Sequence, residues 1–282
     1  MNTLRTLSHH AARRSGALLW FSPRRFECKK KKTEECRNPI TPCDVAFMEP
    51  DKKTCFDMRN VTLERASQHH GRMISSFLNN QHWPREPTVA SLYLPPDSRY
   101  LQVLSDKYAY SGDRLIALEK NDRTDERRLI GVAVANKIFP WMANELEEWG
   151  HSTTDKAERH RMFFQAHCYR HPNLFKKYKV DYIWDIEVLC TASEVSGHGV
   201  CSLLLRHMLE EGVDARHPLA QVTATSTYLA AACEHSGMKK EWSMDYQDFV
   251  DSAGQRAFYP RKPHTSVNIY VQKFKPKAFY CT

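Results

Sequence analysis

Residues 182–209 read YIWDIEVLCTASEVSGHGVCSLLLRHML, and this stretch decides the fold. Residues 182–189 are mostly apolar or aromatic, which is typical of a buried strand. Two glycines follow within residues 196–201, and the leucines of residues 203–209 then recur at helical spacing. The order strand, glycine turn, helix is therefore the central unit of the predicted fold.

The glycine turn is a candidate anion site. A turn of this kind at a helix start lets backbone N–H groups converge on an anion, and the helix dipole adds attraction. The phosphate loop of nucleoside triphosphatases is excluded because no Gly-Lys-Ser or Gly-Lys-Thr follows. The dinucleotide-binding fingerprint is excluded because it needs a third glycine. A coenzyme A pyrophosphate fits better, although two glycines at a helix start are also a common packing solution. The predicted cofactor loop is Ser196, Gly197, His198, Gly199, Val200 and Cys201.

Strands and helices alternate around this unit. Residues 114–119 and 129–134 predict a hairpin, and residues 141–170 predict amphipathic helices. Beyond the unit we expect a strand at 220–224, a helix at 227–235, and strands at 238–242 and 265–273. Upstream, residues 54–59 alternate like a first strand. Asn60 and Thr62 then predict the cap of a helix with apolar residues at 63, 66, 73, 74, 77 and 78.

Between that helix and the hairpin lies the sequence Trp83-Pro84-Arg85-Glu86-Pro87. Its two prolines remove backbone donors and disfavour helix before them, so the segment is expected to be a fixed loop. By residue type alone, Glu86 is an ordinary solvated loop acid.

The order of these elements resembles the GNAT superfamily, whose Arg/Gln-x-x-Gly-x-Gly/Ala loop joins the fourth strand to a helix. The match covers residues 54–273. The chain is most similar to the insect and nematode arylalkylamine N-acetyltransferase-like branch, which shows an aromatic residue followed by Glu-Pro after the first helix, here residues 83–87. Further matches are residues 173–178 (NLFKKY), residues 246–249 (YQDF) and Pro263-His264.

The resemblance implies a GNAT α/β (α+β) fold with a mixed, mostly antiparallel central sheet of about seven strands. Helices flank this sheet, and it splays between its fourth and fifth strands. Pairing of the fourth strand is expected to stop near Leu189, where Leu189, Cys190 and Thr191 would line the pantetheine arm of acetyl-CoA. One backbone N–H there could stabilise the oxyanion. The plain alternative is a core strand.

The resemblance also implies that a primary amine is acylated by direct transfer. Glu86 is then the general base, acting through water, with a pKa raised toward neutrality by an apolar pocket. Cys233, Ser226 and Tyr228 are candidates for the general acid, against the alternative that they only pack or cap a helix. The expected acceptor is an arylalkylamine such as dopamine, serotonin, octopamine or tyramine.

Several residues depart from the family pattern. Ser196 stands where the family has Arg or Gln, Cys201 where it has Gly or Ala, and Cys233 where many members have a tyrosine. The missing guanidinium removes a contact of roughly 1.5–3 kcal/mol, although a cradle of backbone N–H groups survives. Two alternatives therefore stay open. One is a GNAT enzyme for a polyamine, an amino acid or a protein amine, and the other is a catalytically degenerate acyl-CoA-binding protein.

The charge of the chain lies in its N-terminus. Residues 1–40 carry a net charge of +7 out of +8 for the whole chain, which argues against nucleic-acid binding by the folded part. Residues 1–49 are expected to be a basic extension, either a mitochondrial transit peptide or a disordered tail, and residues 50–282 the GNAT domain. The expected location is accordingly the cytoplasm or the mitochondrial matrix.

The remaining expectations are absences. The apolar run at residues 17–21 is far too short to span a membrane. The nine cysteines form no CxxC pair and the histidines no HExxH motif, so no metal is expected. We expect a monomer whose partners are an amine and acetyl-CoA.

Overall fold

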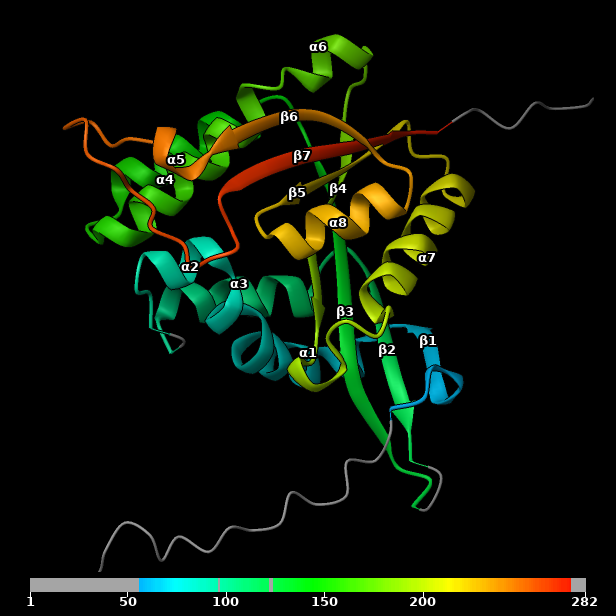
Figure 1. The fold of residues 1–282 in the computed structure, drawn as a ribbon. Coiled ribbons are helices and arrows are strands. Elements are labelled where there is room, and N and C mark those ends of the chain that lie inside the picture. Colours follow the sequence, from blue (N-terminus) through cyan, green and yellow to red (C-terminus); the bar gives the residue numbers. More distant parts are fainter. Residues whose placement is uncertain (1–55, 96, 122–123, 275–282) are drawn as a thin grey trace, which may run out of the picture. The chain divides into compact units, whose positions relative to one another are not determined.

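The computed structural model describes residues 56–95, 97–121 and 124–274. The predicted extension at 1–49 and the boundary at residue 50 lie outside this range and stay predictions. The described chain builds one seven-stranded sheet in the order β1-β2-β3-β4-β5-β7-β6 (Figure 1). Its strands are β1 (Val61–Arg65), β2 (Asp113–Lys120), β3 (Arg127–Ile138), β4 (Ile183–Thr191), β5 (Leu219–Ala224), β6 (Lys239–Asp245) and β7 (Ser266–Lys273).

The β4–β5 pair is parallel, whereas every other pair in the sheet is antiparallel. The parallel pair arises because α7 (Val200–Asp214) carries the chain from the end of β4 back to the start of β5, whereas strands joined by a hairpin run antiparallel. The expected mixed, mostly antiparallel sheet of about seven strands is thereby confirmed.

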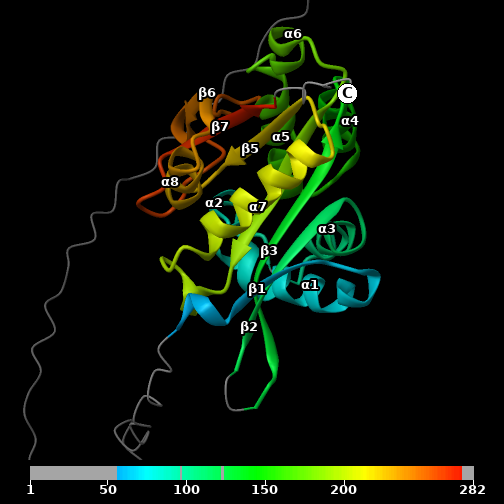
Figure 2. The same ribbon diagram turned by 90° about the vertical axis from the view of Figure 1, so that its right-hand side faces the viewer.

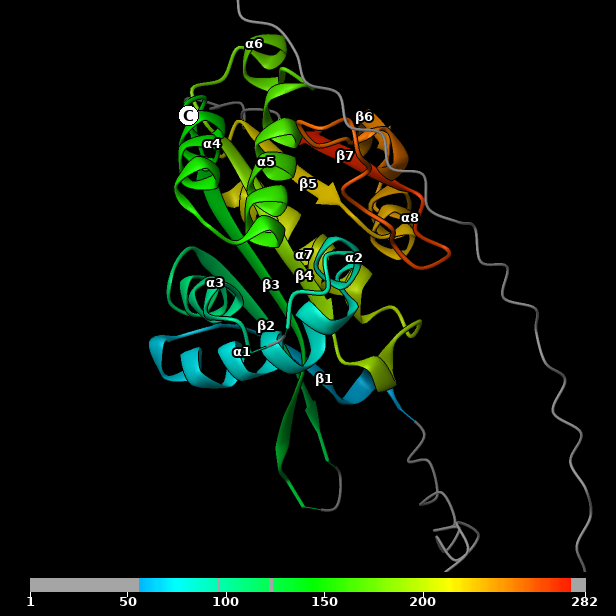
Figure 3. The same ribbon diagram turned by 90° about the vertical axis from the view of Figure 1, so that its left-hand side faces the viewer.

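Helices cover both faces of the sheet (Figures 2 and 3). Because side chains alternate along a strand, β4 presents Trp184 to α7 and the neighbouring Asp185 and Glu187 to α5 and α3. The helices are α1 (Gly71–Phe77), α2 (Pro87–Ser91), α3 (Arg99–Tyr110), α4 (Met142–Ser152), α5 (Lys156–Arg170), α6 (Leu174–Tyr178), α7 (Val200–Asp214) and α8 (Thr227–His235).

Two hydrophobic clusters fill the interior. One joins α1, α3 and α7 to strands β2, β3 and β4, with Trp83, Trp184 and Leu204 buried at its centre. The other joins α4 and α5 to β6 and β7, with Phe164 and Phe258 at its centre. Both clusters include residues of β4 and β5, Trp184 and Ala220 in the first and Ile183 and Leu219 in the second.

The start of the described chain differs from the expectation. The predicted strand at 54–59 is wrong, because residues 58–60 form a 3₁₀ turn capped by Asp57 and the strand is Val61–Arg65. The helix expected after Asn60 begins only at Gly71. The expected hairpin, the helices within 141–170 and the later elements are confirmed.

Candidate active site

The sheet opens between β4 and β5. Only Trp184 with Ala220 and Asp185 with Gln221 pair across these strands. Beyond Asp185, β4 continues beside β3 as far as Thr191, and on its β5 side it has no strand partner among the described residues. The expected splay is thus confirmed, but it begins after Asp185 rather than near Leu189. A longer stretch of the β4 edge is free to pair with a ligand.

The glycine turn lies beyond the end of β4 and leads into α7. Gly197 and Gly199 have φ of 82° and 87°, in the left-handed region that favours glycine, and Gly199 is the N-cap of α7. A Cβ at either position would meet no heavy atom of the described residues within 4 Å, so open space faces the backbone here.

The first turn of α7 is suited to an anion. This helix is 15 residues long, contains no acidic residue in its first turn and has no side-chain hydrogen bond at its N-cap. Its first N–H groups lack intrahelical acceptors and carry the positive end of the dipole. The predicted coenzyme A cradle fits this geometry, since the backbone supplies the donors and Ser196 and Cys201 need supply none.

The side chains of the β4 residues that were predicted to line the pantetheine arm lie on both faces of the strand. Leu189 lines a cavity on the α5 face, whereas Cys190 is buried and burial raises its pKa to about 12. Arg85, which the sequence did not single out, donates from Nη2 to the Thr191 carbonyl and to Cys190 Sγ. Burial also raises the pKa of Cys201 to about 11. Both thiols are therefore protonated at neutral pH.

Glu86 is buried, with 6% of its surface exposed. A 3₁₀ turn at Trp83–Arg85 places it at the N-cap of α2, within the segment that was expected to be a fixed loop. Its Oε2 accepts hydrogen bonds from Thr88 Oγ1 at 2.5 Å and from Val89 N at 2.7 Å. Its Oε1 has no hydrogen-bond partner in the described part of the chain. One carboxylate oxygen is held by the protein and the other is left for a ligand.

The pKa of Glu86 departs from the expectation in sign. Burial raises it, but the Arg161 guanidinium and the hydrogen bonds from Thr88 and Val89 outweigh burial and hold it below the ordinary value. The expected tuning toward neutrality is wrong, because the pocket contains a buried cation that the sequence did not reveal. Glu86 is therefore fully ionised at neutral pH.

A cavity of about 70 Å³ lies on the face of the sheet that α3 and α5 cover, and both Glu86 and Leu189 line it. Its lining includes Glu86 at the N-cap of α2, Arg161 of α5, Tyr108 of α3 and Thr223 of β5. Burial lowers the pKa of His82 to about 4, so this lining residue is neutral at pH 7. The other lining residues are Phe164, Gln165, Cys168, Tyr169, Asp185, Glu187, Leu189, Thr225 and Leu229.

Two carboxylates of this cavity, Asp185 and Glu187, were not predicted as site residues, because the sequence around them is typical of a buried strand. Their neighbours hold them: Tyr169 donates to Asp185 Oδ2 at 2.9 Å, and Tyr108 donates to Glu187 Oε2 at 2.8 Å. The one available signal was that acidic residues alternate with apolar residues here, because a strand buried on both faces is expected to be apolar throughout.

The three general-acid candidates lie outside the lining of the cavity. Ser226 caps α8, accepting a hydrogen bond from Leu229 N at 3.1 Å. Tyr228 is 69% exposed and packs edge-on against His264. Cys233 is fully buried, and burial raises its pKa. Their role in catalysis stays a prediction, as does contact of His198 with a phosphate. The exposed His198 ring lies against Phe56.

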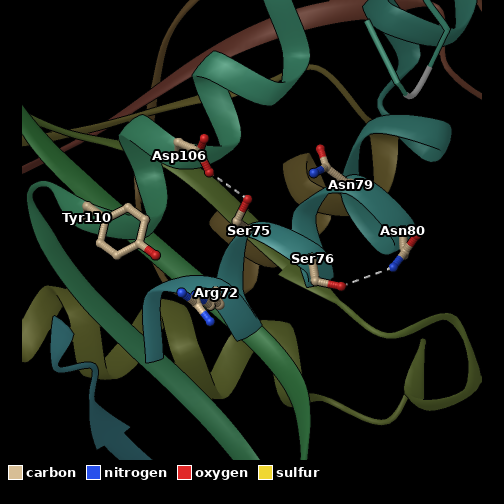
Figure 4. Close-up of a pocket in the computed structure, with 7 residues that line it drawn as sticks. All are labelled: Arg72, Ser75, Ser76, Asn79, Asn80, Asp106 and Tyr110. Carbon is tan, nitrogen blue, oxygen red and sulfur yellow. Dashed lines mark hydrogen bonds between the residues drawn. The ribbon is translucent and has the colours of Figure 1, made fainter. Parts of the chain in front are cut away.

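A second hollow, of about 420 Å³, lies on α1, the turn after it and α3 (Figure 4). Ser75 donates to Asp106 at 2.9 Å across it, and Arg72, Asn79 and Tyr110 stand around it. It contains none of the predicted site residues, and its lining groups are polar and largely exposed. We therefore place the candidate active site at the β4–β5 opening.

Neither a metal site nor a membrane span is found in the described residues. No cluster of three or more His, Cys, Asp or Glu side chains there could hold a metal ion. None of the helices in this part of the chain is long and apolar enough to cross a bilayer.

Comparisons with known proteins place the fold. No protein-family model matches the sequence, and no curated protein matches it. Among solved structures, arylalkylamine N-acetyltransferase 2 from Aedes aegypti is similar with a TM-score of 0.69 and 19% identity, over 77% of this chain and all of that one. Drosophila melanogaster polyamine N-acetyltransferase is similar with a TM-score of 0.68 and 19% identity, over 76% of this chain and all of that one.

A mosquito arylalkylamine N-acetyltransferase-like protein, 5b, is similar to the same degree, with a TM-score of 0.69 and 18% identity over 76% of this chain and 100% of its own. At sequence identities this low the similarity shows the fold alone, and the fold of this chain is the mixed seven-stranded sheet described above. The chain therefore has the GNAT fold, in the form found in these insect N-acetyltransferases.

Proposed function

We propose that the chain is an acyltransferase that moves an acetyl group from acetyl-CoA to a primary amine. One observation carries this proposal: the cavity containing Glu86 reaches Leu189 on β4, in the stretch where no described strand pairs with β4 on its β5 side. The open backbone of the glycine turn follows at the end of the same strand. An acyl donor along the β4 edge would meet an amine in the cavity.

Acetyl-CoA supplies the thioester, whose carbonyl carbon is the electrophile. The backbone of residues 197–201 and the first turn of α7 would hold its phosphates, and the free edge of β4 at 189–191 its pantetheine arm. A backbone N–H of that edge would stabilise the oxyanion. The fit rests on the open space before both glycines and on the absence of acids from the first turn of α7.

Glu86 has two tasks in this reaction. An alkylamine arrives protonated, because its pKa is near ~10.4, and must lose a proton before it attacks. The ionised carboxylate attracts the ammonium to its unpartnered Oε1 and accepts the proton, through water. As the new C–N bond forms and the C–S bond breaks, the electron pair of the C–S bond leaves with the sulfur. The leaving thiolate has the acidity of an ordinary thiol, so it can depart without an acid.

The acceptor comes from the resemblance: an arylalkylamine such as dopamine, serotonin, octopamine or tyramine. Polyamines, amino acids and protein amines are the competing acceptors. A thiol-release assay with acetyl-CoA across an amine panel tests cofactor, reaction and acceptor together. Turnover of at least one amine supports the proposal, and preferential turnover of arylethylamines supports the aryl acceptor. Absence of turnover with every amine contradicts the proposed reaction.

A degenerate acyl-CoA-binding protein is the second candidate. It is favoured by Ser196 in place of a guanidinium and by the position of the three acid candidates outside the cavity. Calorimetry separates the two functions, since coenzyme A binding without turnover supports the second and absence of binding contradicts both. For location we propose the cytoplasm or the mitochondrial matrix.

A further inference from the structure

Arg85 is bonded to the end of β4 and has no task in the proposed reaction. Its Nη2 donates to the Thr191 carbonyl and, over 3.7 Å, to Cys190 Sγ, while its Nε donates to the Gln81 carbonyl at 2.6 Å. The Gln81 side chain in turn accepts a hydrogen bond at Oε1 from Ser193 N at 3.0 Å. The segment that carries Arg85 is therefore fastened to the end of β4 and to the start of the turn that follows it.

The hydrogen-bond ladder shows on which side of β4 this guanidinium lies. Ala192 N donates to the Ile130 carbonyl of β3 at 2.8 Å. The preceding residue, Thr191, lies opposite Gly131 in the same register. In an antiparallel pair, the backbone groups of one residue point to the partner strand and those of the next point away from it. The Thr191 carbonyl thus points to the β5 side, so Arg85 occupies the open edge of β4.

The charge of Arg85 is available to a ligand. Its side chain is exposed, and within the described residues it donates only to two carbonyl oxygens and a thiol. These bonds use Nε and Nη2, so Nη1 has no hydrogen-bond partner in that part of the chain. The acid of the following turn, Glu194, is already paired with Arg128 at 2.7 Å. Arg85 therefore presents an anchored, uncompensated cation.

This cation lies close to a turn that lacks one. Ser193–Val195 is a single 3₁₀ turn, closed by a hydrogen bond from Ser196 N to the Ser193 carbonyl at 3.2 Å. The glycine turn therefore begins about 6 Å beyond the residue that Gln81 holds. Ser196 supplies no guanidinium to an anion bound there, whereas Arg85 reaches the same end of β4 from another part of the chain. A guanidinium is a planar fork that matches the oxygens of a phosphate.

We propose that Arg85 binds the pyrophosphate of the acyl donor, in place of the guanidinium that the glycine turn does not contain. This inference rests on the proposed use of acetyl-CoA and adds a donor-binding residue from outside the turn. The Nη1 donors would hold a phosphate oxygen while Nε and Nη2 keep the fork fixed to the main chain. The Thr191 carbonyl, with a second lone pair, can still accept from a pantetheine amide.

The test compares acetyl-CoA with S-acetylpantetheine, which has the same thioester and lacks the phosphates. In the full-length protein, Arg85→Gln should lower the ratio of kcat/KM for acetyl-CoA to that for S-acetylpantetheine at least about tenfold, the effect of one hydrogen bond to a charged group. The amine is the one that the panel shows to be turned over fastest. Calorimetric binding of coenzyme A without amine should weaken by the same factor. Arg72→Gln, which removes another exposed arginine at the second hollow (Figure 4), should change neither quantity.

An equal loss with both donors overturns the assignment, because Arg85 would then serve the β4 edge or the neighbouring Glu86 rather than a phosphate. Unchanged coenzyme A affinity in Arg85→Gln also overturns it and leaves the acyltransferase function standing. Weakened coenzyme A binding in a protein that acylates no amine supports the assignment and contradicts the proposed reaction alone. An unaltered protein that binds no coenzyme A overturns both.

Ionic strength gives a second measurement. Salt screens an exposed contact between ions, whereas it has little effect on bonds that only fasten Arg85 to the main chain. The difference in coenzyme A affinity between the unaltered protein and Arg85→Gln should therefore shrink as sodium chloride is added. A difference that stays constant with salt overturns the phosphate contact.

Discussion

At the scale of single residues, the site depends on the electrostatic interaction of Glu86 with Arg161, and the sequence pointed only to Glu86. Glu86 could be singled out because its Glu-Pro context resembles a family motif. Arg161 could not, since it is one of three arginines on α5 and nothing in the local pattern separates it from Arg159 or Arg170. Only the folding of α5 onto residues 82–86 makes it the partner of Glu86, and with it the sign of the Glu86 pKa shift is reversed.

Replacing Glu86 by Gln should lower turnover by about 10²–10⁴-fold, the usual contribution of a general base. It should also lower the free energy of unfolding, because Arg161 loses the carboxylate charge that favours its ionised form. Since the folded-state pKa of Glu86 is lowered, its contribution to stability is present above pH ~4.5 and disappears as the pH falls through the folded value. Urea unfolding of both proteins across the acid range measures this, and parallel curves would contradict it.

Replacing Arg161 by Met should raise the pKa of Glu86, because burial then acts without the opposing charge. The acidic limb of the kcat/KM profile should move to higher pH accordingly. Arg159→Met is the matched control, since Arg159 lies on the same helix outside the cavity lining and donates to the Thr153 carbonyl. An acidic limb that stays in place in Arg161→Met would show that a group other than Glu86 controls it.

At the scale of elements, most strands and helices followed from apolar periodicity, and the exceptions have local causes. Residues 61–65 carry apolar side chains at Val61 and Leu63, and the next at Ala66 also satisfies a helical spacing. Pairing with β2 decides for a strand. The β4–β5 opening was expected from the resemblance, yet its starting residue depends on the register between two strands, which no local pattern encodes.

The glycine turn leads to an element-scale prediction. Gly199→Ala should weaken coenzyme A binding several-fold, because an L-residue at φ of 87° costs roughly 1–2 kcal/mol and tilts the N–H groups that precede α7. Gly254→Ala is the control, with a φ of 74° and equal open space but a place far from the turn in the sequence. Calorimetric titration with coenzyme A measures both. A similar loss in the two variants, or in neither, contradicts a role for the turn.

At the scale of the whole molecule, the candidate site draws on residues more than 130 positions apart in the chain, from His82 to Leu229. The family resemblance predicted that a glutamate and a cofactor loop belong to one site. It did not predict the other charged groups that line the cavity. Asp185 and Glu187 face inward because the strand that carries them is covered by α3 and α5, and coverage is a property of the assembled layers.

The predicted basic extension at residues 1–49 leads to a prediction for the whole protein. Removing residues 1–49 should leave acetyl transfer unchanged within about twofold, since none of the proposed site residues lies there. If residues 1–49 are a transit peptide, a fluorescent full-length fusion enters mitochondria and the shortened fusion does not. Cytosolic fluorescence from the full-length fusion would end the transit-peptide hypothesis.

The free edge of β4 also connects the stability of the protein to the supply of its ligand. Residues 186–191 lie in the middle of the sheet, yet in the described structure they hydrogen-bond as a ladder on one side only. A pantetheine arm that pairs there protects those amides from hydrogen exchange and adds RT ln(1 + [L]/Kd) to the free energy of unfolding, about 2.7 kcal/mol at a hundredfold excess over Kd. The lifetime of the folded chain would then rise and fall with the concentration of acyl-CoA around it.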